Sequence, residues 1–201
     1  MYSCREMLEA VFGMKDLSLH MLDLVQNSIS AQSSHTTVGI RADRGRGILE
    51  ISVDDNGIGM DRELLQRVTD PFTTTRTTRR VGLGIPLIKA SAERAAGGFE
   101  ITSEKGKGTR IDAWFKIDNI DRPPLGDVAG TITDIIISEP SREFGLVLEN
   151  GSDTFRFETK EIKEKLGEVP ITEYAVTIWM KEYLNEGIKV IFGGVLDEID
   201  S

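Results

Sequence analysis

Hydrophobic and polar positions first follow a helical period between Asp16 and Ala31. Apolar residues three and four positions apart mark one face of this predicted helix, and Asp16 or Ser18 can cap its start. The apolar face holds Leu22, Val25 and Ile29. A polar stripe on a second face holds His20, Asp23 and Asn27. The helix therefore combines a core-facing side with polar groups that share one direction.

Alternating and helical stretches follow, and together they predict a mixed α and β chain. The predicted strands cover residues 36–41, 48–54, 99–103, 109–117, 144–149 and 154–158. The further predicted helices cover residues 61–68, 85–95, 127–138, 160–166 and 172–185. We expect Trp179, on the last helix with Ile178 and Tyr183, to lie in the core. Residues 70–80 show no apolar period, which predicts a long loop.

Charge is distributed unevenly along the chain. The net charge is −9, yet residues 1–119 hold 16 Lys and Arg against 16 Asp and Glu, which leaves 8 against 17 for residues 120–201. An acidic second part argues against nucleic acid or an anionic membrane as partner, because such binding depends on neutralising phosphates. The stiff Arg122-Pro123-Pro124 supports a boundary near Asn119. The predicted parts are an N-terminal extension (1–13), a main domain (14–119) and an acidic α+β domain of unknown role that we expect to dock a partner protein (120–201).

The single cysteine and the absence of targeting signals predict a cytoplasmic protein. Cys4 excludes an internal disulfide and suits a reducing compartment. The sequence shows neither a secretory signal nor the ~20 apolar residues that cross a bilayer. Met14 resembles a natural start of translation, so we expect residues 1–13 to be a flexible N-terminus or an over-long start. The alternative is an arm that packs on a second subunit and makes a homodimer.

An acidic turn follows the strand 48–54 and favours a ligand site. The turn contains Asp55, Gly57 and Gly59. A carboxylate at the end of a buried strand, followed by glycines, lets a ligand approach the backbone closely. Such a carboxylate can accept a hydrogen bond from the exocyclic amine of a purine base. A calcium loop is excluded, because Ile58 and Leu65 stand where calcium ligands are needed.

Other segments offer groups that suit phosphate and metal. Asn27 has a neutral amide oxygen, which suits a Mg²⁺ that also binds phosphates. The sequence Gly82-Leu83-Gly84 precedes the helix 85–95, whose free N–H groups favour phosphate. The loop 71–81 supplies hydroxyl and guanidinium donors, and we expect it to become ordered when nucleotide binds. Its donors include Thr73, Thr74, Thr75 and Arg76, and Arg79 and Arg80 could instead serve a partner.

These motifs, in this order, resemble those of the superfamily of gyrase, Hsp90-type chaperones, histidine kinases and MutL proteins, often called GHKL. The motifs are Asp23–Ala31 (N-box), Asp55–Gly59 (DxGxG box), Asp70–Arg76 (F-box and lid), Gly82–Ile85 (second glycine box) and Gly106–Thr109 (last box). The resemblance covers about residues 14–118, and it is greatest to the ATP-binding domain of histidine kinases. No P-loop sequence is present in the chain.

The resemblance implies a fold and a ligand. The fold would be α+β, a two-layer α/β sandwich of the GHKL (Bergerat) type with a small C-terminal α+β appendage. The ligand would be ATP with Mg²⁺, where Asp55 and a water shared with Thr109 recognise adenine N6, Asn27 holds the metal, and Arg76 is the lid cation. The positions implied to contact nucleotide are Asn27, Asp55, Gly57, Gly59, Thr73, Thr74, Thr75, Arg76, Gly82, Leu83, Gly84 and Thr109.

Catalysis depends on Asp23, one helical turn before Asn27. In the ATPase and anti-sigma-kinase branches this position is a Glu that acts as general base. Asp is shorter by one methylene, so a base and a Mg²⁺-water or structural role both stay open. We expect His20 to be a core or supporting residue, because the family's phosphoacceptor lies in a separate dimerisation domain that this sequence lacks.

Three functions agree with these observations. We favour a stand-alone histidine-kinase-like ATP-binding protein that hydrolyses ATP or transfers its phosphoryl group to a partner. The alternatives are an anti-sigma-type Ser/Thr protein kinase and a non-catalytic nucleotide sensor in which lid ordering controls docking. Hydrolysis by MutL-like dimer closure is disfavoured, because the expected transducer domain is missing.

Overall fold

The computed structural model describes residues 16–69 and 84–193. Within them, one mixed sheet has the strand order β3-β4-β2-β1-β5-β6. Its strands are β1 (His35–Asp43), β2 (Ile48–Asp55), β3 (Gly98–Glu104), β4 (Gly108–Lys116), β5 (Glu143–Glu149) and β6 (Thr154–Glu158). The helices are α2 (Leu17–Ser30), α3 (Arg62–Arg67), α4 (Gly84–Arg94), α5 (Val128–Ser138), α6 (Thr159–Leu166) and α7 (Tyr174–Phe192). The predicted strands and helices are all present.

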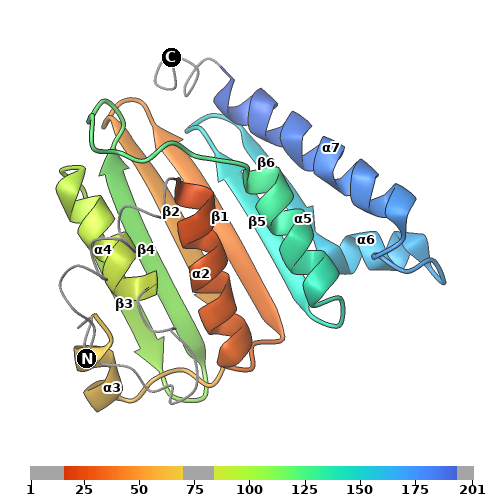
Figure 1. Cartoon of the computed structure of the whole chain (residues 1–201), viewed down its shortest axis with the longest axis horizontal. Helices are drawn as coiled ribbons and strands as arrows, with labels where there is room; N and C mark the ends of the chain where they lie inside the picture. Colours follow the sequence, from red (N-terminus) through yellow and green to blue (C-terminus); the bar gives the residue numbers. More distant parts are fainter. Residues whose placement is uncertain (1–15, 70–83, 194–201) are drawn as a thin grey trace.

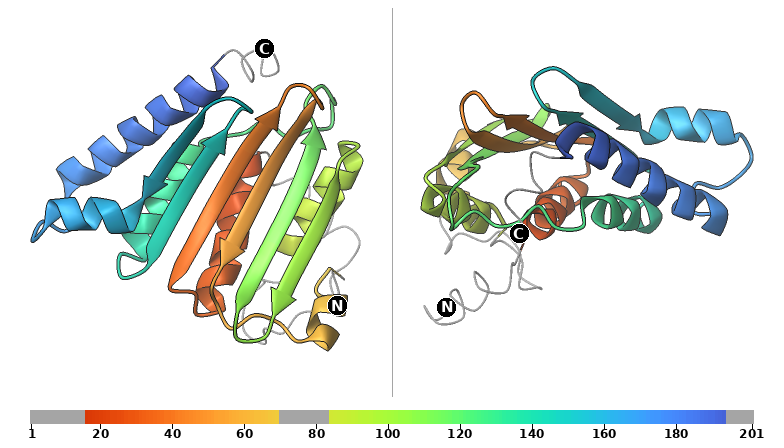
Figure 2. Two further views of the ribbon diagram at one scale, coloured as in Figure 1. Left: turned by 180° about the vertical axis from the view of Figure 1, so that it is seen from behind. Right: turned by 90° about the horizontal axis from the view of Figure 1, so that it is seen from above.

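Helices cover one face of the sheet, and no described helix covers the other, which we call the bare face (Figure 1, Figure 2). At the centre of the sheet, the strand residues that point to the helical face are buried, and they include Val38, Ile40, Leu49, Ile51, Val53, Ala113 and Phe115. Each large aliphatic side chain buried in this way contributes about 1.5–3 kcal/mol. The predicted two-layer α/β sandwich is therefore confirmed.

Helix α2 lies over the middle of the sheet, between α4 and α5 (Figure 1). The Asp16 side chain caps it by accepting a 3.0 Å hydrogen bond from the Leu19 N–H. The predicted core face was slightly misplaced. Leu22 and Ile29 are only partly buried, and the most buried apolar residues of the helix are Leu17, Met21, Leu24 and Val25. Neighbouring helices on both sides bury more of α2 than the single face that the periodicity predicted.

Residues beyond 119 continue the same sheet. Strand β5 pairs in parallel with β1, from His35 opposite Glu143 to Arg41 opposite Glu149, and β6 pairs antiparallel with β5. The connection between β4 and α5 also contacts α2, because the N–H groups of Leu17 and Ser18 donate to the carbonyls of Pro124 and Leu125. The predicted boundary near Asn119 falls in this connection. We refer to residues 128–192 as the C-terminal extension.

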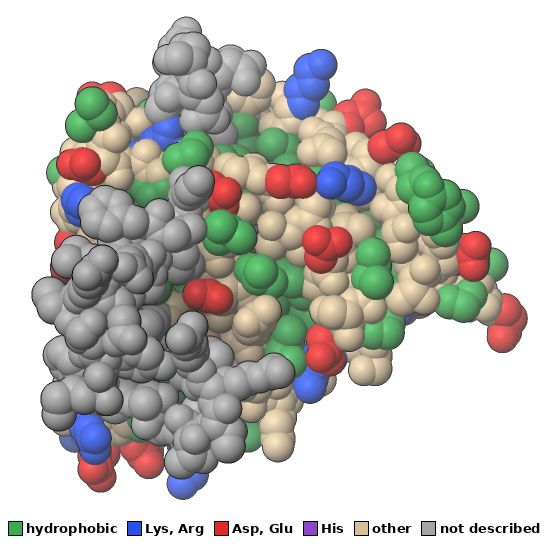
Figure 3. Space-filling model, viewed as in Figure 1, with side chains coloured by type: hydrophobic (Ala, Val, Ile, Leu, Met, Phe, Trp, Pro, Cys, Tyr) green, Lys and Arg blue, Asp and Glu red, His purple; other side chains and the backbone are tan. Residues whose placement is uncertain are grey.

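Helix α7 covers β5 and β6 from the helical side and packs against α5. It runs to Phe192, beyond the predicted end at 185. The prediction that Trp179 lies in the core is wrong, because Trp179 is 44% exposed. The Trp179 ring stacks on the Tyr183 ring, with 5.3 Å between the ring centroids. Periodicity could not identify this exposed side, because apolar residues surround much of the helix. Figure 3 shows hydrophobic side chains on the surface near the start of α7. In the described part of the chain, no helix is long and apolar enough to cross a membrane.

Candidate functional site

Asp55 is the last residue of β2, points to the helical face of the sheet and is 8% exposed. Its Oδ2 accepts a 2.8 Å hydrogen bond from the Ser28 hydroxyl of α2, and its Oδ1 accepts a 2.8 Å bond from the Gly57 N–H. These two donors offset the cost of burying a carboxylate and fix its orientation. The fixed carboxylate keeps lone pairs that can accept a hydrogen bond from a ligand.

Neighbouring backbone leaves no space for a side chain at Gly57 and Gly59, the two glycines of the acidic turn. A Cβ on Gly57 would lie 2.7 Å from the Ala31 carbonyl oxygen, and one on Gly59 would lie 2.0 Å from the Glu104 carbonyl oxygen. Gly59 also has φ near +61°, a region that side chains disfavour. The turn is therefore packed between the end of α2 and the β3–β4 hairpin.

Thr109 lies next to Asp55 on the neighbouring strand. The two residues are paired across β2 and β4, so their side chains share a face of the sheet. The Thr109 hydroxyl is 2.9 Å from the Ser103 hydroxyl, and Ser103 also accepts from the Met60 N–H at 2.8 Å. The structure thus brings the acidic turn and the last motif (Gly106–Thr109) together at one end of the neighbouring strands β2 and β4.

Asp23 and Asn27 meet the start of α4. A Cβ built on Gly84 would lie 3.0 Å from the Asp23 Cβ, 3.5 Å from the Asp23 Oδ2 and 3.6 Å from the Asn27 Nδ2. The missing side chain of Gly84 therefore leaves room between the polar stripe of α2 and the N-terminal end of α4. Free N–H groups and the positive end of the helix dipole suit an anion at such a place.

Burial changes the ionisation of two groups on α2. Desolvation raises the pKa of Asp23 above its ordinary value, because the charged form loses hydration. Desolvation lowers the pKa of His20 to about 4. The Nδ1 atom of His20 is buried without a hydrogen-bond partner in the described residues, as is the Ser91 hydroxyl on α4. His20 is therefore a neutral core residue at physiological pH, as the sequence predicted.

The predicted lid lies outside the described residues, together with two glycine-box positions. The positions concerned are Thr73, Thr74, Thr75, Arg76, Gly82 and Leu83. Among the residues that the structure describes, no group of three or more His, Cys, Asp or Glu could hold a metal ion. The donor set near Gly84 consists of one amide and one carboxylate, which suits a Mg²⁺ that takes its other ligands from phosphates and water.

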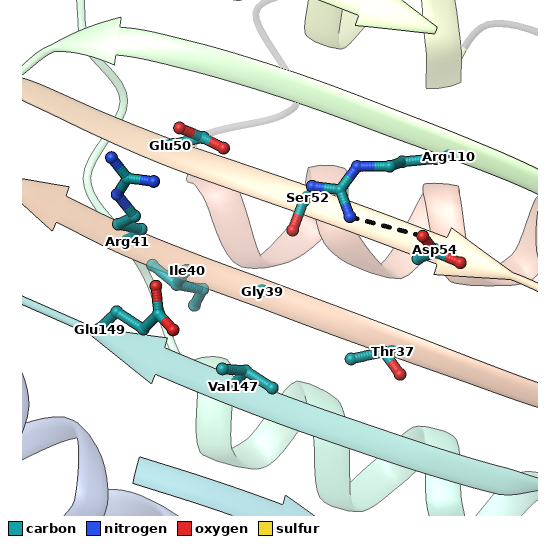
Figure 4. A pocket seen from close by; sticks show the side chains of 10 residues that line it. All are labelled: Thr37, Gly39, Ile40, Arg41, Glu50, Ser52, Asp54, Arg110, Val147 and Glu149. Atoms are coloured by element: carbon teal, nitrogen blue, oxygen red, sulfur yellow. Dashed lines mark hydrogen bonds and ion pairs between the residues drawn. The ribbon is translucent and has the colours of Figure 1, made fainter. Parts of the chain in front are cut away.

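The bare face of the sheet has a separate hollow of about 250 Å³, shown in Figure 4. Arg110 lies at its edge and is paired with Asp54 at 3.4 Å and with Asp112 at 2.6 Å. Asp54 and Asp55 are consecutive on β2, so they point to opposite faces. The hollow therefore does not share a face with Asp55, Thr109 and Asp23.

Several residues that build the site were not predicted. Neither Ser28 nor Asn56 is among the predicted site residues. The Asn56 Oδ1 accepts hydrogen bonds from the Ser33 hydroxyl and from the Ser34 and His35 N–H groups at 2.9–3.0 Å. A hydroxyl on the buried side of an amphipathic helix was the available signal for Ser28. Asn56 gave a weaker signal, since Asn is common in turns.

The sheet and the helix layer define a two-layer α/β domain, and the polar groups of α2 and the end of β2 form a candidate site on its helical side. The family model for histidine kinase-, DNA gyrase B- and HSP90-like ATPases matches residues 15–119, just over half of the chain. The chain therefore belongs to this family, and the predicted superfamily is confirmed.

Curated relatives match about half of the chain. The sensor histidine kinase ZraS of Escherichia coli O157:H7 is 28% identical over 106 residues, which is 53% of this chain and 23% of the relative. The histidine protein kinase DivJ of Caulobacter vibrioides is 32% identical over 108 residues, which is 52% of this chain and 18% of the relative. This chain thus matches less than a quarter of either kinase.

A solved structure resembles more of the chain. The crystal structure of the N-terminal domain of a DNA repair protein aligns with a TM-score of 0.53 at 15% identity. It covers 78% of this chain and 58% of the other chain. At this identity the likeness concerns the fold alone.

Proposed function

We propose that this protein binds Mg²⁺ and ATP between α2 and α4, and hydrolyses ATP or transfers its γ-phosphoryl group to a partner protein. The observation that carries the proposal is the placement of three groups along α2. Ser28 holds the Asp55 carboxylate at one end, and Asp23 and Asn27 face Gly84 at the start of α4. Family membership supports the same ligand.

Each end of the nucleotide would meet different chemistry. Asp55 would accept a hydrogen bond from the adenine 6-amino group, with Thr109 beside it. The N–H groups at the start of α4 would bind the phosphates. Asn27 would hold Mg²⁺, which when bound neutralises charge on the phosphate oxygens. Thr73, Thr74, Thr75 and Arg76 of the lid, with Gly57, Gly59, Gly82 and Leu83, would complete the contacts.

Asp23 would act as the general base. Its raised pKa means that the carboxylate holds a proton more strongly than an ordinary Asp, which favours proton abstraction. The carboxylate would take a proton from water or from a partner hydroxyl, and that oxygen would form a bond to the γ-phosphorus. The bond from the γ-phosphorus to the β–γ bridging oxygen would break, and ADP would carry the released electron pair.

Phosphoryl transfer to a partner requires a docking surface. We propose that residues 120–201 provide it, and that the boundary near Asn119 separates this part from the ATP-binding domain. The reducing environment suggested by the lone Cys4 supports a cytoplasmic location. We also propose that residues 1–13 pack on a second copy of the chain and make a homodimer.

One experiment separates the alternatives. The purified chain is incubated with γ-labelled ATP and Mg²⁺, alone and with co-purifying proteins. Label in free phosphate supports hydrolysis, and acid-stable label on a partner supports Ser/Thr transfer. Saturable ATP binding without turnover in any mixture would contradict the catalytic part of the proposal and identify a nucleotide sensor.

A further inference from the structure

Residues 31–35 join α2 to the first residue of β1, and this segment, called here the turn 31–35, contacts both the acidic turn and the C-terminal extension. On the first side, Asn56 accepts from Ser33, Ser34 and His35 through one oxygen. The Ile58 N–H also donates to the Ala31 carbonyl at 2.8 Å. The turn 31–35 and the acidic turn therefore form one hydrogen-bonded unit, and a shift in one displaces the other.

On the second side, Arg142 contacts this unit from the connection between α5 and β5. One guanidinium N–H donates to the Ser33 carbonyl, and the Nε donates to Glu139 at 3.1 Å. The neighbouring Glu143 N–H donates to the Ser34 carbonyl at 2.9 Å. The Arg142 side chain is 26% exposed, so its bond to Ser33 is shielded from much of the solvent.

Helix α6 holds Arg142 in turn. The Lys163 ammonium donates to the Arg142 carbonyl at 2.7 Å and to Glu143 at 3.0 Å. The Thr159 hydroxyl, which is fully buried, donates to the same Glu143 carboxylate at 2.6 Å. The Arg142 side chain that contacts Ser33 therefore extends from an anchored backbone, and its Nε is held by Glu139.

We propose that Arg142 is a positioning residue for base recognition, which rests on the proposed role of Asp55. Arg142 fixes the turn 31–35, the turn fixes Asn56, and Asn56 keeps the adjacent Asp55 and Gly57 where Asp55 can meet a base amine. The family match ends at residue 119, so this support is supplied by the C-terminal extension and not by the matched domain. The extension thereby sets the selectivity of the site for the base.

The test compares ATP with purine riboside triphosphate, which lacks the 6-amino group. Calorimetric titration of the full-length chain with Mg²⁺ gives the ratio of the two affinities. Arg142→Met keeps much of the stem and removes the donors, and we expect it to reduce the ratio by about tenfold. Arg142→Lys restores a cationic donor and should recover most of the ratio. Arg156→Met, at an exposed arginine of β6, is the matched control and should leave the ratio unchanged.

The outcomes are distinct. A parent protein that prefers ATP, with the preference kept in Arg142→Met, overturns the role of Arg142 alone. A parent protein that binds both nucleotides equally overturns the assignment of Asp55 and, with it, this inference. If Arg142→Met does not fold, as judged by circular dichroism, Arg142→Gln supplies a neutral donor for the same comparison. Glutamine is shorter and lacks the guanidinium that reaches both Ser33 and Glu139, so a ratio equal to that of the parent in folded Arg142→Gln would overturn the role of Arg142.

Discussion

The Ser28 hydroxyl donates a 2.8 Å hydrogen bond to the Asp55 carboxylate across 27 positions of sequence. This bond joins the buried side of α2 to the end of β2, so the helix that carries Asp23 and Asn27 is fixed relative to the carboxylate at the other end of the site. A buried charge in such a bond is costly to disturb, because loss of the partner leaves it poorly solvated.

Replacing Asp55 by Asn should abolish nucleotide binding while the domain stays folded. The amide can still accept one hydrogen bond from Ser28 or Gly57, but it presents donors where the base amine needs an acceptor. Calorimetric titration with ATP and Mg²⁺ measures the loss, and far-ultraviolet circular dichroism checks the fold. Asp54→Asn, on the opposite face of β2, is the matched control. Unchanged affinity in Asp55→Asn would rule out its role in adenine recognition.

Replacing Asn27 by Ala should remove the part of ATP affinity that depends on Mg²⁺. Asn27 is the amide next to the space left by Gly84, so its loss removes a metal ligand while the base contact at Asp55 persists. Titrations with Mg²⁺ and with EDTA should converge in the variant and differ in the parent. A parallel loss of affinity under both conditions would show that Asn27 serves the fold or the phosphates directly.

Replacing Asp23 by Asn should lower γ-phosphoryl release or transfer by about 10²–10⁴-fold with little change in ATP affinity. The raised pKa of Asp23 also predicts how the rate depends on pH. The rate should rise as the carboxylate ionises, and this rise should occur at a pH above 3.8, the ordinary pKa of an Asp side chain. Phosphate release measured against pH tests both statements. A profile of the same shape in Asp23→Asn would exclude Asp23 as the base.

His20 should make the protein less stable in mild acid. Its pKa falls from 6.5 in the unfolded chain to about 4 in the folded chain, so the unfolded chain binds more protons between these values. The contribution of the neutral His20 to the free energy of unfolding is fully present above pH 6.5 and is lost as the pH falls towards 4. The free energy of unfolding falls by about 3 kcal/mol over this range because of His20. The raised pKa of Asp23 has the opposite sign, since it lowers stability as pH rises.

Urea unfolding of the parent and of His20→Leu, at pH 7 and pH 4.5, isolates the His20 contribution. Asp23 is present in both proteins, so its effect cancels in the comparison. The variant should lose less stability than the parent between the two pH values. Equal losses would show that His20 is not buried in its neutral form.

Much of the local structure could be predicted because local rules decide it. Asp16 caps α2 as its side chain chemistry requires, and the predicted strands 144–149 and 154–158 pair as a hairpin whose turn holds Gly151 at φ +94°. The order of the motifs was enough to identify the family. Placement of the lid residues 70–83 lies outside the described residues, so their predicted contacts with phosphate stay predictions.

Packing between distant segments could not be predicted in the same way. The exposed position of Trp179 depends on which side of α7 meets α5 and β6, and the burial of Leu17 and Met21 depends on helices on both sides of α2. Periodicity reports that a helix has an apolar side, but it does not report how many neighbours the helix has.

The sequence by itself determined the elements, because they follow from short-range pattern, and the family, because its motifs stand in a recognisable order. The nucleotide residues that this resemblance implies stay predictions. Only the tertiary structure decided that Ser28 holds Asp55, that Gly84 leaves room beside Asp23 and Asn27, and that the C-terminal extension joins the sheet through β5. Hydrogen bonds and close approaches of this kind depend on distances between segments far apart in sequence, which no local pattern specifies.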